Sequence, residues 1–172
     1  MREGGFPARN EPLDDGGLRK AAGLVSVGSN AGLLFSAPEH AARQTAEALG
    51  GEAVIEEALC DLDHGDWTGR RFAEVHAADR EAFAGWIADP AAGAPGGESF
   101  ATAAARVGDW LSDMAQLDGA IRAVAGPSII RILVALAIDI PIAAALRIDI
   151  APLSATTLSF NRGWRLQGIC RA

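Results

Sequence analysis

The stretch AVAGPSIIR, residues 123 to 131, has the residue types of an anion-binding site. A short apolar run leads through Gly126 and Pro127 into an apolar stretch with helical spacing, and the first turn of a helix presents free backbone N–H groups to anions. Ser128 is the only side chain of the Ala125–Ser128 turn that could act as a nucleophile. It has neither a G-x-S-x-G setting nor a histidine close by in the sequence, so we expect Gly126 and Ser128 to bind an anion rather than to catalyse.

The segment DLDHGD, residues 61 to 66, gathers three carboxylates and an imidazole, which are metal-ligand types. It departs from the calcium-loop pattern because Gly65 comes one position early and no glutamate closes the loop. We therefore expect a structural loop role for His64. The sequence predicts no metal and no cofactor.

The elements that must position these residues alternate between strands and helices. A chain of 172 residues with 49% hydrophobic composition predicts one domain with a substantial core over residues 1–172, of which 1–16 are irregular. The alternation predicts an α/β fold, a three-layer α/β/α sandwich. Helices are expected at 17–27, 38–51, 71–90, 99–116 and 127–139, strands at 32–37, 53–59 and 120–125, and two or three strands within 147–170 with a hairpin turn at 161–163.

Charge and cysteine usage exclude several classes of partner. The balance of 22 acidic and 15 basic residues, a net charge of −7, argues against nucleic acid and anionic membranes. The longest apolar run is interrupted by Arg131, Asp139 and Pro141, and the N-terminus has no apolar signal segment, so no membrane insertion is expected. The isolated Cys60 and Cys170 indicate a reducing compartment, and we predict a cytoplasmic protein.

Five pieces in order give the chain a recognisable pattern: EPLDDGGLRKA, FSAPEHAARQTAEAL, LCDLDHGDWTGR, PGGES and AVAGPSIIR. Together they cover nearly the whole chain and resemble the histidine phosphatase superfamily, also called phosphoglycerate mutase-like. The resemblance implies a phosphate pocket with a nucleophilic histidine, two arginines, a second histidine, and a carboxylic acid that protonates the leaving oxygen.

Compared position by position, this sequence lacks most of the residue types that the resemblance implies for the pocket. The acid falls on Asp61, whereas the pocket arginine falls on Ala41 and the second histidine on Gly126. The family's RHG motif at the end of a first strand has no counterpart before the EPLDDGG piece. Since one such charge-stabilising group is worth about 3 kcal/mol, we predict a pseudophosphatase with a binding or interaction role.

Three further residues are candidates for the edge of this pocket. His40 and Arg43 flank the position of the lost arginine, and either could supply positive charge to a small anionic or phosphorylated ligand. The alternative, which we favour, is a surface histidine near a helix start and a salt bridge from Arg43 to Glu39 or Glu47. Glu98 of PGGES is expected at the pocket rim.

Without the family's first strand, the strand at 32–37 and the strand at 120–125 would each lose a neighbour. Unpaired buried backbone groups are costly, so either these two strands pair with each other or another segment or chain fills the gap. Two alternatives therefore stay open beside the pseudophosphatase. One is an active phosphomonoesterase or mutase whose first strand and nucleophile lie outside this sequence, and the other is a partner subunit or homo-oligomer that docks through an open sheet.

Overall fold

A parallel sheet lies at the centre of the computed structural model, which describes residues 4–8, 10–26 and 32–171. Its strands are β1 (Leu33–Ser36), β2 (Val54–Ile55) and β3 (Ile121–Val124), in the order β2-β1-β3. Ser36 pairs directly with Val124, so β1 and β3 close against each other and leave no gap between them. Of the two outcomes expected for these strands, direct pairing is the one observed.

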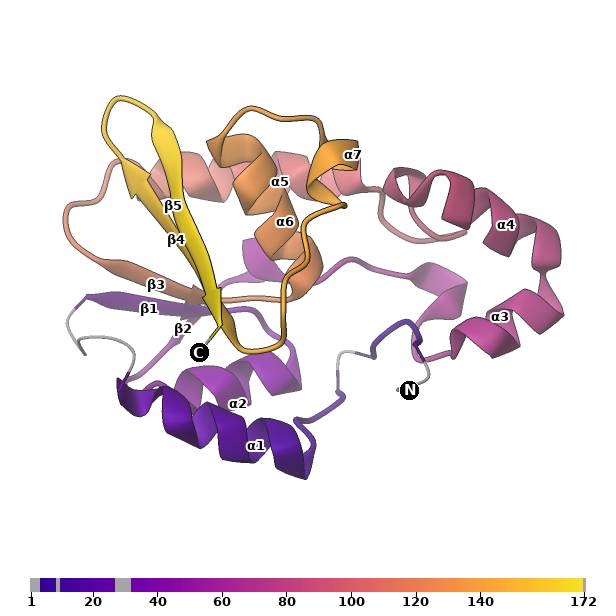
Figure 1. Cartoon of the computed structure of the whole chain (residues 1–172), viewed down its shortest axis with the longest axis horizontal. Coiled ribbons are helices and arrows are strands. Elements are labelled where there is room, and N and C mark those ends of the chain that lie inside the picture. The colour runs from indigo at the N-terminus through magenta and orange to yellow at the C-terminus, as the bar shows by residue number, and fades with distance from the viewer. Residues whose placement is uncertain (1–3, 9, 27–31, 172) are drawn as a thin grey trace.

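Helices cover both faces of this sheet, which confirms the predicted three-layer α/β/α arrangement (Figure 1). One layer holds α1 (Asp15–Ala22) and α2 (His40–Ala48), and the other holds α5 (Phe100–Met114) and α6 (Pro127–Ala137). Because its apolar residues recur every three or four positions, α5 buries one face against the sheet. The buried residues of this face are Phe100, Ala103, Val107, Trp110 and Leu111.

A second hydrophobic cluster lies apart from the sandwich, where α3 (Phe72–Ala78) and α4 (Arg80–Ala88) extend away from it (Figure 1). The single helix predicted over 71–90 is wrong, because the chain breaks at Asp79. The Asp79 side chain accepts a hydrogen bond from the Ala82 N–H and so caps a new helix. Phe6 of the N-terminal segment is 3% exposed in the middle of this cluster.

Several element boundaries also differ from the sequence prediction. The helix expected from Pro38 begins at His40, and the strand expected over 53–59 is only β2, followed by a turn of 3-10 helix. The helix expected from Gly17 begins at Asp15, and the predicted end of that helix at Val27 lies outside the described residues. The short 3-10 turns are η1 (Gly23–Ser26), η2 (Glu57–Leu59), η3 (Gly65–Trp67) and η4 (Pro90–Ala92).

The C-terminal part forms a hairpin with its own two-stranded antiparallel sheet, β4 (Ser154–Phe160) and β5 (Trp164–Arg171). The turn predicted at 161–163 is confirmed, since the Asn161 N–H donates to the Gly163 carbonyl. A short helix that the sequence did not predict, α7 (Ile142–Ala145), connects α6 to this hairpin. Within the described ranges no helix has both the length and the hydrophobicity to cross a membrane.

Candidate functional site

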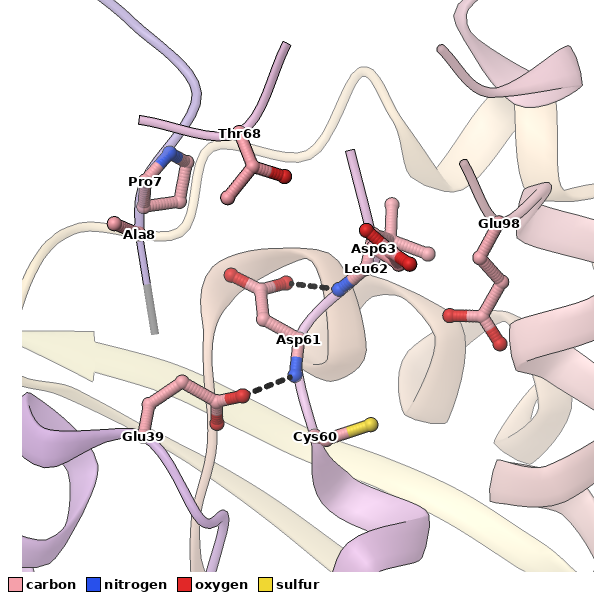
Figure 2. A pocket seen from close by; sticks show the side chains of 9 residues that line it. All are labelled: Pro7, Ala8, Glu39, Cys60, Asp61, Leu62, Asp63, Thr68 and Glu98. Carbon is pink, nitrogen blue, oxygen red and sulfur yellow. Dashed lines mark hydrogen bonds between the residues drawn. The ribbon is translucent and has the colours of Figure 1, made fainter. Parts of the chain in front are cut away.

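A cavity of about 440 Å³ lies where the loop 60–63 faces the N-terminal segment (Figure 2). Pro7, Ala8 and Thr68 form one wall, and the loop with Glu39 forms the opposite wall. Four of the described lining residues are carboxylates, and none is a lysine, an arginine or a histidine. The lining residues are Pro7, Ala8, Glu39, Cys60, Asp61, Leu62, Asp63, Thr68 and Glu98.

The core fixes the loop that carries Asp61. Leu59 is fully buried and Leu62 is 7% exposed, so both apolar side chains anchor the loop from below. The Asp61 N–H donates to Glu39 Oε1 at 3.2 Å, and Asp61 Oδ1 accepts the Leu62 N–H at 2.9 Å (Figure 2). These bonds hold the Asp61 carboxyl at the cavity, which it lines.

Glu98 reaches the cavity from the residue before the cap of α5, and Arg106 holds it. The guanidinium donates to both Glu98 oxygens, at 2.9 and 2.8 Å, and its third bond goes to the Ala58 carbonyl at 2.6 Å. The hydrogen bond with Glu98 raises the pKa of Arg106 above its usual value, despite partial burial. Arg106 therefore offsets one of the four carboxylates, and no sequence signal identified this residue.

Gly126 does not line the cavity but touches Asp61 from behind. A Cβ atom placed on Gly126 would lie 2.7 Å from Asp61 Oδ2, closer than any real contact of that kind. Gly126 is also the N-cap residue of α6, and as a glycine it offers no side chain to cap that helix. The Asp61 carboxylate thus stands against the helix start that the sequence indicated as an anion site.

The other predicted residues do not gather at this cavity. His40 is the first residue of α2, and Ser128 lies in the first turn of α6; neither is among the described lining residues. Arg43 is exposed, and the salt bridge that we expected from it is not formed with any described carboxylate. The Arg43 N–H donates to the Glu39 carbonyl at 3.0 Å.

His64 packs into the second hydrophobic cluster, and its structural loop role stays a prediction. Its ring packs against Phe6 with centroids 5.0 Å apart, and the Gly65 N–H next to it donates to Asp63 Oδ1 at 2.8 Å. The part of the chain that the structure describes holds no group of three or more metal-ligating side chains arranged to bind an ion. Burial lowers the pKa of His64, although the charges of Asp61 and Asp63 act in the opposite direction.

The lowered pKa of His64 makes the stability of the protein depend on pH. A folded state that prefers neutral His64 binds fewer protons than the unfolded chain, so stability falls as the pH drops below the unfolded pKa of about 6.5. Because the ring is partly exposed, we expect a loss below about 1 kcal/mol between about pH 7.5 and pH 5.5. Urea unfolding of the wild type and of His64→Asn measures this loss, which the variant should lack. His76→Asn, on the surface of α3, should retain it.

The comparisons with known proteins agree with this fold. The model of the histidine phosphatase superfamily (branch 1) matches residues 7–169. A mycobacterial glucosyl-3-phosphoglycerate phosphatase has a similar structure, with a TM-score of 0.84 and 23% identity over 98% of this chain and 92% of that one. A putative alpha-ribazole-5'-P phosphatase from Escherichia coli gives a TM-score of 0.87 at 20% identity, over 98% of this chain and 89% of that one.

A curated relative is longer than this chain. The bifunctional protein of Mycobacterium tuberculosis is 33% identical over 103 residues, which are 55% of this chain and 28% of the relative. This chain therefore matches less than a third of that protein's length. The mixed α/β sandwich and the match of the family model to residues 7–169 define the fold as histidine phosphatase-like. The chain belongs to the histidine phosphatase superfamily.

Proposed function

We propose that this chain is a pseudophosphatase, a member of the superfamily that binds rather than hydrolyses. The charge of the cavity lining supports the proposal most strongly. A phosphate pocket needs cations around the transferring oxygens, and here four carboxylates line the cavity with no described cation among them. Ala41 and Gly126 stand where the family pattern has an arginine and a histidine.

The proposal is tested by hydrolysis of p-nitrophenyl phosphate. The purified protein is expected to release nitrophenol no faster than buffer, because each missing charge-stabilising group costs about 3 kcal/mol of transition-state stabilisation. Asp61→Asn should leave that background unchanged, as should Asp66→Asn, an exposed carboxylate outside the lining. Turnover above buffer that falls in Asp61→Asn but not in Asp66→Asn would contradict the proposal.

One observation favours an active phosphatase as the second candidate. Asp61 faces the cavity from the position of the family acid, so a nucleophilic histidine supplied from outside this sequence would find a carboxyl group in place. Because β1 and β3 pair directly, the strand that carries this histidine would have to separate them. The relatives named above are themselves described as phosphatases. The genomic sequence just upstream decides between the candidates. An open frame that encodes a strand ending in RHG, and turnover by the longer chain, would favour the enzyme.

The remaining proposals concern the partners. Docking of a partner subunit through the sheet stays a prediction, although β1 and β3 pair directly and leave no gap between them. Homo-oligomerisation stays a prediction, which sedimentation of the purified protein tests. The small phosphorylated ligand predicted at the start of α6 also stays a prediction, and the Asp61 carboxylate beside Gly126 would oppose such a ligand by charge repulsion.

A further inference from the structure

A second cavity, of about 590 Å³, lies between the end of α1 and the segment 149–153 that leads into β4. This volume is in the range of small-molecule sites. Its polar side chains are Arg19, Lys20 and Asp149. The charge of its described lining is therefore net positive, opposite in sign to that of the first cavity and to the whole chain, which carries −7.

The two cations have no ionic partner within the described part of the chain. Arg19 and Lys20 are exposed in the last turn of α1, and neither forms a salt bridge with a described carboxylate, Asp149 included. Their position complements the negative end of the helix dipole, but that interaction does not neutralise a full charge. Both charges remain available to an anion that enters the cavity.

The rest of the lining is apolar and fixed in place. Leu24 is 9% exposed, and Ile150, next to the lining residue Asp149, is 6% exposed, so both walls are anchored in the interior. Pro152 and Leu153 complete the opposite wall. Leu153 has a φ of 58°, a left-handed conformation that leucine rarely adopts and that tends to occur at ligand sites.

From this combination we infer that the second cavity binds a small anion on an apolar body, such as an organic phosphate, phosphonate or carboxylate. Arg19 and Lys20 pair with the anionic group, and Leu24, Pro152 and Leu153 contact the apolar body. Asp149 selects against a second negative charge. This inference does not depend on the proposed function, since none of these residues lines the first cavity.

Benzylphosphonate is a suitable probe because it cannot be hydrolysed. Titrated into the ¹⁵N-labelled full chain at low salt, it should saturably shift the amide signals of 19–24, 149–151 and 153. Inorganic phosphate and benzyl alcohol should bind more weakly. Because exposed ion pairs are weak, the Arg19→Gln/Lys20→Gln double variant should weaken binding by only about tenfold. Asp149→Asn should strengthen binding by a few-fold.

The spectra of the variants also report whether they are folded, so loss of binding is separable from loss of structure. Arg162→Gln/Arg165→Gln, two exposed hairpin cations, is the matched control and should bind as the wild type does. Shifts centred on residues 60–63, unchanged affinity in the Arg19/Lys20 variant, or weaker binding in Asp149→Asn would each overturn the inference.

Discussion

Gly65→Ala is expected to lower the free energy of unfolding by about 3 kcal/mol. Gly65 has a φ of 51°, which alanine adopts only with strain, and it lies in close contact with the loop that precedes α5. A Cβ there would lie 2.5 Å from the Pro95 carbonyl oxygen and 2.6 Å from the Gly97 nitrogen. Both neighbours are backbone atoms, so the two loops must separate.

Separation of the loop around Gly65 from the loop that precedes α5 would also change the shape of the first cavity. The Glu98 N–H donates to the Asp63 carbonyl at 2.8 Å across the same pair of loops, and both side chains line the cavity. We therefore expect Gly65→Ala to loosen the acidic wall as well as to destabilise the fold.

Gly85→Ala is the matched control, measured by the same urea unfolding. Gly85 is in α4 with nothing within 4 Å of an added Cβ, so alanine should stabilise by about 0.5–1 kcal/mol through helix propensity. Equal stabilities of Gly65→Ala and the wild type would show that the two loops are not packed as described.

Local rules explain which elements the sequence predicted. Ser99 caps α5 as expected, with its hydroxyl accepting the Thr102 N–H, because a cap depends on residues only three positions apart. The break between α3 and α4 at Asp79 was not predicted from the sequence. Phe72, Val75 and Phe83 keep near-helical spacing across the break, and aspartate is a weaker interruption signal than proline or glycine.

The charge of the first cavity could not be predicted, because it depends on residues that are distant in the sequence. Asp61 and Glu98 were identified through motifs, whereas the Glu39 side chain, which accepts the Asp61 N–H from 22 residues away, joined them only through the fold. Arg106 reaches Glu98 and Ala58 from the middle of α5, where arginine is an ordinary surface residue. The pairing of β1 with β3 was open as well, since the sequence allowed either closure or an added strand.

At Gly126, the sequence and the structure both bear on which side chain this position can accept. The resemblance to the family predicts a histidine at this position, and the structure places the Asp61 carboxylate in the space that any side chain at 126 would enter first. Gly126 has a φ of −67°, so alanine is not excluded by the backbone. The contact with Asp61 is therefore the reason to expect a cost.

We expect Gly126→Ala to destabilise the protein by up to about 1 kcal/mol, the low end of the cost of overpacking, because the end of the Asp61 side chain, and no backbone atom, has to shift. In an Asp61→Ala background the added methyl group meets no carboxylate, so the same substitution should be nearly neutral. The double-mutant cycle, measured by urea unfolding, should give a coupling energy of similar size. If the effects of Gly126→Ala and Asp61→Ala on the free energy of unfolding were additive, the contact between these two residues would be contradicted. With such coupling, a histidine introduced at 126 could not be accommodated until Asp61 had moved, so Gly126→His alone should not raise phosphatase activity above that of the wild type.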